Sequence, residues 1–180
     1  MKKIGIIGFG GRIRGMVWQM ERFKADLRVA AVADLQPDQA RERMKAAGLA
    51  PDSVRLYTDA ARMLEREELD GVMIGTRCSL HTRFAIQVLK RNLPLFLEKP
   101  VCTTRSDWDK LYAASRATRS PVVVSFPLRV TAHVQQAAEI LQRGEIGRVH
   151  HVQAWNNVPY GACYYLDWYR DEKETQGLFL

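Results

Sequence analysis

The stretch Gly8-Phe9-Gly10-Gly11-Arg12-Ile13-Arg14-Gly15 decides the fold of this chain. It follows the apolar run 4–8 directly, and apolar residues at helical spacing come after it. A glycine-rich turn between a strand and a helix lets the backbone approach a phosphate, which then lies at the positive end of the helix. The third glycine position of this pattern holds Ile13, so the match is partial and we expect the helix to lie slightly further from the strand. A glycine-rich turn without a ligand is the alternative interpretation.

Asp34 supplies the second signal, because it stands directly after the apolar run 27–33. An acid at the end of the second strand accepts hydrogen bonds from the ribose hydroxyls of a dinucleotide. Its charge repels a 2′-phosphate, and the next residue is Leu35 rather than an arginine, so the sequence favours NAD over NADP. NADP stays open, because Arg12 or Arg14 could reach a 2′-phosphate. The alternative for Asp34 is an acid that stabilises the start of the next helix.

Short apolar runs alternate with amphipathic segments over the first two-thirds of the chain. The runs are almost continuously apolar, which is typical of parallel strands covered on both faces. The pattern predicts an α/β fold with a doubly wound parallel Rossmann sheet and right-handed crossovers. We expect Ser79 to cap one of the helices. The expected strands are 4–8, 27–33, 71–75, 94–97 and 121–125, and the expected helices are 37–47, 79–91 and 104–119.

The rest of the chain has a different pattern. A helix is expected over 131–143, a possible long strand over 147–158 and an aromatic-rich segment over 160–169. The chain stops in an apolar run, 177–180, which resembles an element cut in the middle. We therefore assign residues 1–125 to a dinucleotide-binding domain and residues 126–180 to the start of a second domain.

Composition excludes several classes of protein. The 180 residues carry a net charge of +7, but basic and acidic residues alternate along the chain, which is typical of solvated helices and not of a nucleic-acid surface. Apolar runs are too short for a membrane helix and no signal peptide is evident, so we expect a cytoplasmic protein. No metal site is expected, because Cys78, Cys102 and Cys163 lack zinc spacing and the adjacent His150 and His151 point to opposite sides of a strand.

A further group of polar residues follows the later apolar runs. Asp70-Gly71-Val72 begins one run, which leads into Thr76 and Arg77 and then into a helix with His81 in its first turn. The next run ends in Glu98-Lys99-Pro100. The carboxyl ends of such strands border the cofactor crevice, where a buried Glu-Lys pair would serve a function. A surface ion pair in an ordinary loop is the alternative.

The order of these motifs resembles the Gfo/Idh/MocA family, which includes glucose–fructose oxidoreductase and the inositol dehydrogenases. The resemblance extends over essentially the whole chain, and Glu98-Lys99-Pro100 is its most specific part. It implies a Rossmann domain followed by an α/β domain with a mostly antiparallel sheet. In the family this second domain carries the substrate site and often the oligomer interface, so a homo-oligomer formed through that sheet is implied for the full-length form.

The resemblance also implies roles for particular residues. Lys99 corresponds to the catalytic lysine, which transfers a proton or orients the substrate, and the Lys99–Pro100 bond is expected to be cis. The implied cofactor-binding residues lie in the glycine loop, at the strand ends and in the second domain. They are Gly8, Phe9, Gly10, Gly11, Arg12, Ile13, Asp34, Thr76, Arg77, His81, Glu98, Pro100, Arg129, Trp168 and Arg170.

The implied activity is an NAD-dependent oxidoreductase that transfers a hydride between the nicotinamide and a sugar, a polyol or a related hydroxyl or keto compound. The family's catalytic histidine segment is expected beyond Leu180, so we expect this chain alone to bind NAD(H) weakly and to be inactive. Two alternatives stay open. One is an enzyme of glycosidase or epimerase type that uses NAD without net redox change, and the other is a non-catalytic NAD-binding sensor.

Overall fold

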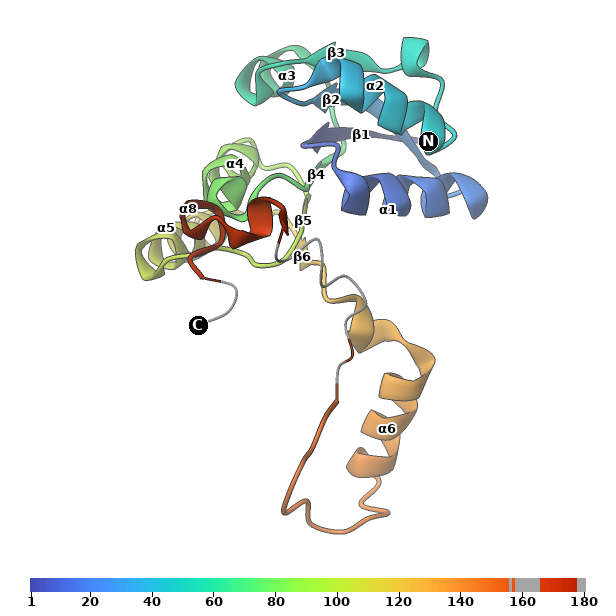
Figure 1. Cartoon of the computed structure of the whole chain (residues 1–180), viewed down its shortest axis with the longest axis vertical. Coiled ribbons are helices and arrows are strands. Elements are labelled where there is room, and N and C mark those ends of the chain that lie inside the picture. The colour runs from blue at the N-terminus through green and yellow to red at the C-terminus, as the bar shows by residue number, and fades with distance from the viewer. Residues whose placement is uncertain (156, 158–165, 178–180) are drawn as a thin grey trace.

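A six-stranded sheet forms the centre of the computed structural model, which describes residues 1–155, 157 and 166–177 (Figure 1). The strand order is β3-β2-β1-β4-β5-β6 and every neighbouring pair is parallel. The order reverses between β1 and β4, which is the point where doubly wound sheets bind ligands. The expected parallel Rossmann sheet is therefore confirmed. The strands are β1 Lys2–Ile7, β2 Leu27–Ala33, β3 Arg55–Tyr57, β4 Gly71–Ile74, β5 Leu95–Leu97 and β6 Val122–Val124.

Helices cover both faces of this sheet, because successive strand residues point to opposite sides. Ile6 packs in a buried cluster with Val17 and Met44, whereas the adjacent Ile7 packs with Met63 in a second buried cluster on the other face. The first cluster lies under α1 and α2, and the second lies under α3, α4 and α5. These helices are α1 Gly11–Arg22, α2 Pro37–Ala46, α3 Ala60–Arg66, α4 His81–Leu89 and α5 Arg105–Arg116.

Several local expectations need correction. The short elements β3 and α3 were not predicted from the sequence. Ser79 does not cap α4, since the capping position is Leu80 and the Ser79 hydroxyl instead hydrogen-bonds the Glu174 carboxylate. The strand expected over 147–158 is absent from residues 147–155, which pair with no other strand; residues 156 and 158 lie outside the described part. A strand needs a neighbour for its backbone hydrogen bonds, and these residues have none.

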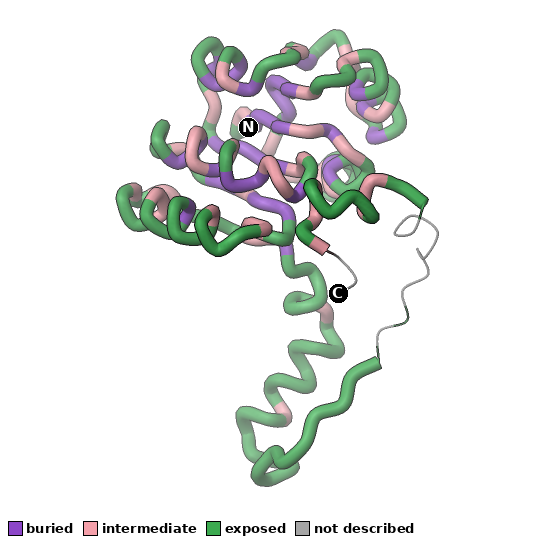
Figure 2. Tube along the Cα trace, turned by 60° about the vertical axis from the view of Figure 1, so that its left-hand side comes forward, coloured by how far each residue is buried: buried purple, intermediate pink, exposed green. Residues whose placement is uncertain are grey.

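An arm leaves the sheet after β6 and points away from it (Figure 1). It contains the 3₁₀ helices η3 Pro127–Val130 and η4 Trp168–Arg170, the helix α6 Ala132–Gln142 and the short α8 Glu172–Thr175. The tube in Figure 2 is exposed along almost all of residues 127–155. The C-terminal part of the arm comes back to the main sheet, where α8 contacts η2 Cys78–Leu80. The described residues of the arm form no antiparallel sheet.

No helix among the described residues is long and apolar enough to cross a bilayer.

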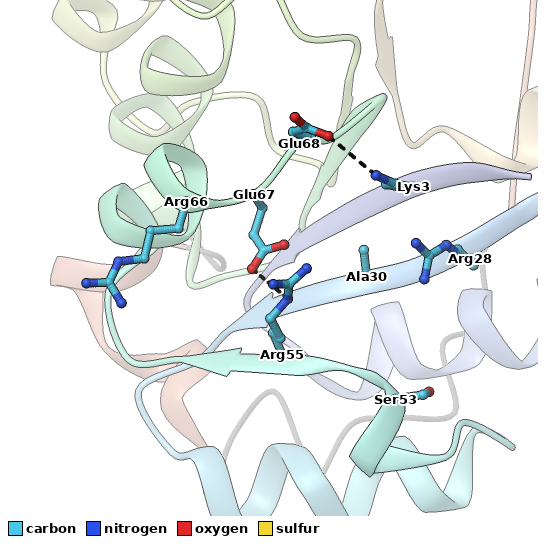
Figure 3. Close-up of a pocket in the computed structure, with 8 residues that line it drawn as sticks. All are labelled: Lys3, Arg28, Ala30, Ser53, Arg55, Arg66, Glu67 and Glu68. Carbon is cyan, nitrogen blue, oxygen red and sulfur yellow. Dashed lines mark ion pairs between the residues drawn. The ribbon is translucent and has the colours of Figure 1, made fainter.

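A cavity of about 240 Å³ lies at the amino ends of β1, β2 and β3, at the opposite end of the sheet from the glycine loop (Figure 3). Its carboxylates are already paired. Glu67 is buried, with its Oε1 3.0 Å from Arg55 Nε, and Glu68 lies 3.6 Å from Lys3 Nζ. We interpret this cluster as a structural link between α3 and the edge strand β3.

Tyr57 completes this link, because its hydroxyl donates to Glu67 Oε1 at 2.5 Å. This hydrogen bond, together with burial and the charge of Glu67, raises the pKa of Tyr57 above its ordinary value of 10.0. The folded protein thus holds the phenolic proton more tightly than the unfolded chain does. The resulting stabilisation is fully present below the ordinary pKa and is lost as the pH rises through the folded pKa.

The substitution Tyr57→Phe should therefore flatten the alkaline part of the stability profile. We expect the free energy of unfolding of the unaltered chain to fall more steeply than that of the variant above about pH 10. Urea denaturation at a series of pH values measures both slopes. Tyr112→Phe, on the exposed face of α5, is the matched control and should keep the slope of the unaltered chain. Equal slopes for Tyr57→Phe and the unaltered chain would contradict this assignment.

Candidate functional site

The glycine loop lies at the carboxyl end of β1, against Thr76 in the loop that follows β4. Gly8 has φ of +80°, a conformation that favours glycine, and a Cβ there would lie 2.8–2.9 Å from atoms of Thr76. The N–H of Gly8 donates to the carbonyl of Ala33 at 2.8 Å, which ties the loop to the end of β2. Both the conformation and the lack of space therefore require glycine at this position.

Ile13 occupies the position where the dinucleotide-binding pattern has its third small residue. It is fully buried. A Cβ added to Gly75 would lie only 2.1 Å from Ile13 Cγ1, so the larger side chain on α1 is accommodated by the missing side chain at the end of β4. The sequence analysis did not identify Gly75 as a site residue, although it ends the run 71–75 that was expected to be a strand.

The first turn of α1 is arranged to receive an anion. Gly10 is the capping residue, no side chain caps the helix, and its first turn contains no acidic residue. A Cβ added to Gly11 would meet nothing within 4 Å, so the backbone is open there. The N–H groups of a helical first turn have no partner within the helix and attract negative charge. These groups fit the pyrophosphate of a dinucleotide.

Asp34 lies beside this loop, as the sequence predicts. Its Oδ2 accepts from the N–H of Phe9 at 2.8 Å, and its Oδ1 accepts from the N–H of Gln36 at 2.9 Å. Phe9 itself is fully buried. The carboxylate thus fixes the glycine loop and also stabilises the entrance of α2, so the two interpretations of Asp34 are compatible.

Arg12 and Glu98 form an ion pair on the other side of the loop. Arg12 Nε lies 3.2 Å from Glu98 Oε1, and the Glu98 side chain is only 8% exposed. Glu98 follows β5, whereas Asp34 follows β2, and β1 and β4 lie between these strands. Arg12 is therefore bound on the side of the loop away from Asp34. Its guanidinium offsets the negative charge of the buried carboxylate next to the open helix end.

His81 connects the loop that follows β4 with the loop that follows β5. It is buried, with Nδ1 2.6 Å from the Pro100 carbonyl and Nε2 3.2 Å from the Thr76 carbonyl. The Lys99–Pro100 bond is cis, as expected, and Lys99 is exposed. Burial raises the pKa of the Cys78 thiol, while the positive charge of Lys99 acts in the opposite direction. Lys99 stands, exposed, just after β5 at the carboxyl edge of the sheet.

Three of the expected site residues lie late in the chain, and the structure brings them only partly to the strand ends. They are Arg129, Trp168 and Arg170. The Arg77 guanidinium lies 4.1 Å from the ring centroid of Trp168, which places that tryptophan on the loop after β4. Arg170 belongs to the same short helix η4 and is exposed. Arg129 lies in η3, where its guanidinium is 5.3 Å from the ring centroid of Phe126. The structure gives neither Arg129 nor Arg170 a contact with the glycine loop.

Residues 2–126 match the model of an oxidoreductase family with an NAD-binding Rossmann fold, Gfo/Idh/MocA. The chain belongs to the Gfo/Idh/MocA family. Its NAD-binding Rossmann domain has the strand order, glycine loop and strand-end acid described above. The family identified by resemblance from the sequence is thus confirmed, and so is NAD as the cofactor of the fold.

Relatives of this chain include proteins named as dehydrogenases of inositol and of D-apiose. Inositol 2-dehydrogenase of Gluconacetobacter diazotrophicus is 30% identical over 153 residues, covering 84% of this chain and 44% of that protein. D-apiose dehydrogenase of Paraburkholderia graminis is 30% identical over 127 residues, covering 71% of this chain and 33% of that protein. The chain spans less than half the length of these relatives.

Solved structures of similar fold include two that contain NAD(H). Myo-inositol dehydrogenase of Lactobacillus casei, in complex with NAD(H) and myo-inositol, superimposes with a TM-score of 0.75 at 22% identity, covering 82% of this chain and 43% of that one. The WlbA dehydrogenase of Bordetella pertussis, in complex with NADH and UDP-GlcNAcA, gives a TM-score of 0.71 at 20% identity, covering 81% and 43%. These similarities support the fold.

The contact between Ile13 and Gly75 can be tested by a double-mutant cycle. Gly75→Ala should destabilise the chain by about 1–3 kcal/mol, because the new methyl group overlaps Ile13. Ile13→Ala alone should cost about 2–5 kcal/mol through the cavity it leaves. The double variant should lose less stability than the sum of the two single losses. The added methyl group at residue 75 would then partly fill the space that the truncated residue 13 leaves, instead of overlapping it. Chemical denaturation measures all three free energies of unfolding.

Gly11→Ala is the control for this cycle, because a Cβ there meets nothing within 4 Å. It should leave stability unchanged within about 0.5 kcal/mol. Strictly additive effects of Ile13→Ala and Gly75→Ala would refute the proposed packing of α1 against β4.

Proposed function

We propose that this chain is the cofactor-binding part of an NAD-dependent oxidoreductase that acts on a sugar, a polyol or a related hydroxyl or keto compound. One observation carries the proposal: a strand-end carboxylate, Asp34, is fixed beside a glycine loop that opens an uncapped helix. That arrangement combines an acceptor for ribose hydroxyls with donors for a pyrophosphate.

The proposed binding roles follow from these positions. Backbone N–H groups of the first turn of α1 hold the pyrophosphate, and the space at Gly11 leaves room for it. Asp34 accepts hydrogen bonds from the ribose. Thr76 and His81 shape the loop after β4, where the nicotinamide end of the cofactor would lie in a doubly wound sheet. Arg77 and Trp168 border the same loop.

We propose that Lys99 takes part in the reaction, as the group that takes the proton or orients the substrate. The nicotinamide, when bound, accepts or donates a hydride. Oxidation of an alcohol also releases a proton, and an amine placed at the substrate can take it or orient the hydroxyl. Lys99 is exposed at the carboxyl end of β5, and the buried His81 holds the backbone that follows it. It is therefore available to a substrate that lies over this edge of the sheet.

The substrate class is inferred from the relatives. Their names include inositol and D-apiose dehydrogenases, whose substrates carry several hydroxyl groups. We assign the substrate site and the interface of a homo-oligomer to a second domain with a mostly antiparallel sheet, which begins after residue 125. Arg129 and Arg170 lie in that part of the chain, and we assign them to its contacts with cofactor or substrate.

Binding of the cofactor is tested by Asp34→Ala. We expect the affinity for NAD(H) to fall about tenfold or more, because the ribose loses its acceptor and the loop loses its anchor on Phe9. Isothermal titration calorimetry with NADH gives the dissociation constants. Asp38→Ala removes an acid from the first turn of α2 and is the matched control, expected to bind as the unaltered chain does. Equal affinities for both variants would contradict the role of Asp34.

The role of Lys99 is tested in a chain that also carries the proposed second domain. With myo-inositol and other polyols as substrates, Lys99→Met should lower the rate of NADH formation about 10²–10⁴-fold, since the group that takes the proton is gone. Binding of NADH should persist. Lys110→Met, on α5, is the control with the same change of charge. Unchanged turnover in Lys99→Met would exclude the lysine from the reaction.

A further inference from the structure

Arg43 is a site residue that the sequence analysis did not identify. It lies on α2 and is half buried. Its Nη1 donates to the carbonyl of Phe9 at 3.4 Å, and its Nη2 donates to Gln39 Oε1 at 3.0 Å. The guanidinium is therefore held at two points, one of which is the glycine loop itself.

Asp34 binds the other side of the same residue, through the N–H of Phe9 at 2.8 Å. One residue of the glycine loop is thus held between an acid from the end of β2 and a base from α2. Asp34 contacts the N–H of Phe9 and Arg43 contacts its carbonyl, so the two side chains reach the two polar groups of one backbone residue. A positive group thus lies on the same residue of the glycine loop as the acid that would accept the ribose hydroxyls, where it can attract a 2′-phosphate.

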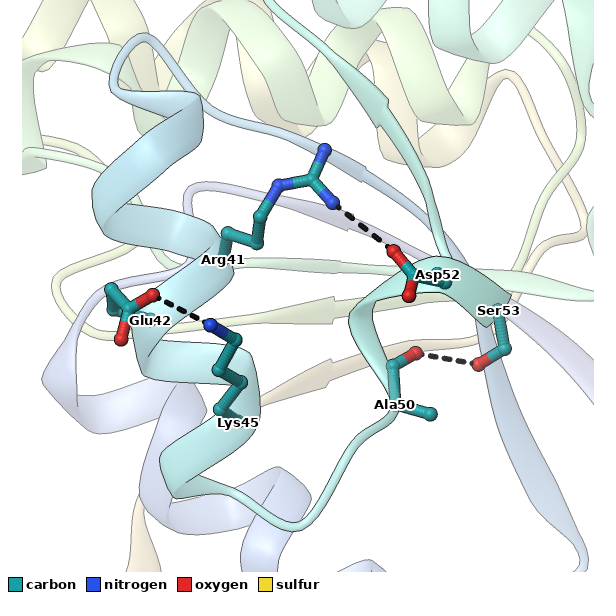
Figure 4. Close-up of polar contacts among 6 residues, drawn as sticks. All are labelled: Arg41, Glu42, Lys45, Ala50, Asp52 and Ser53. Atoms are coloured by element: carbon teal, nitrogen blue, oxygen red, sulfur yellow. Dashed lines mark hydrogen bonds and ion pairs between the residues drawn. The ribbon is translucent and has the colours of Figure 1, made fainter.

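Three other basic side chains near Arg43 or the glycine loop form ion pairs with acidic residues. Arg12 pairs with Glu98 on the far side of the loop. Arg41, two residues before Arg43, lies 3.5 Å from Asp52, and Lys45 lies 2.9 Å from Glu42 (Figure 4). Among these four cations, Arg43 is the one that contacts the glycine loop beside Asp34.

We propose that Arg43 makes the site accept NADP(H) as well as NAD(H), by binding the 2′-phosphate next to Asp34. A guanidinium presents two parallel donors to phosphate oxygens and forms charge-assisted hydrogen bonds with them. The proposal rests on the proposed role of Asp34 as the ribose acid. Arg43 is distinct from Arg12 and Arg14, the two residues that the sequence suggested for this role, of which the structure places Arg12 beside Glu98.

The test compares the dissociation constants of NAD⁺ and NADP⁺ by calorimetry in the unaltered chain, Arg43→Gln and Arg41→Gln. We expect the unaltered chain to bind NADP⁺ within about tenfold of NAD⁺. Arg43→Gln should weaken NADP⁺ about tenfold or more and NAD⁺ by less than about threefold. Arg41→Gln removes the same charge from the same helix and should leave the ratio of the two constants unchanged.

Arg43→Lys separates geometry from charge, because it keeps the charge and loses the planar pair of donors. We expect it to bind NADP⁺ with an affinity between those of the unaltered chain and Arg43→Gln. An equal loss of affinity for both cofactors in Arg43→Gln would show that Arg43 only holds the glycine loop in place, and it would overturn the proposal. So would an equal change in Arg41→Gln, or NAD⁺ binding without NADP⁺ binding in the unaltered chain. If neither cofactor binds, the proposed function itself fails.

Discussion

The close approach of the β1–α1 turn to the end of β4 is the constraint on which the site depends. Gly8 leaves no room for a side chain against Thr76, and Gly75 leaves none against Ile13. These contacts bring the first turn of α1 to the crevice where the strand order reverses. The helix end can then present its N–H groups to an anion at that crevice. A side chain at either glycine would push the helix away and remove the donors from the cofactor.

Two carboxylates flank the open helix end; one forms an ion pair with an arginine, and the other shares a contact residue, Phe9, with an arginine. Asp34 and Arg43 contact the backbone of Phe9, while Glu98 and Arg12 form an ion pair beyond β4. An anionic cofactor would be repelled by uncompensated carboxylates at this distance. The ion pair with Arg12 offsets the charge of Glu98, so the positive helix end can act on the pyrophosphate. Asp34 orders the loop through Phe9, and in the proposed role it would also accept the ribose hydroxyls.

The sequence predicted the parts of the site that follow from local pattern. The bounds of β2, the glycine loop and Asp34 were predicted correctly, and the cis Lys99–Pro100 bond followed from the family resemblance. The strand β3 was missed because its three residues, Arg55-Leu56-Tyr57, form no continuous apolar run, unlike those of the equally short β5 and β6. Gly75 and Arg43 act through contacts with residues distant in sequence, and a single sequence contains no signal for such pairs. The strand expected over 147–158 failed because alternation alone does not supply a neighbouring strand.

The arm explains how the proposed substrate domain could meet the cofactor. Its apolar side chains are unusually exposed, with Val152 at 78% and Trp155 at 84%, and such surface normally packs against other protein. The arm leaves the sheet after β6 and returns to it where Trp168 stacks on Arg77. Both ends of the arm therefore lie at the carboxyl ends of the strands, the edge of the sheet that also carries the glycine loop and Lys99. A domain built on this arm would close over that edge, where a hydroxyl-bearing substrate must lie to reach both the lysine and the nicotinamide.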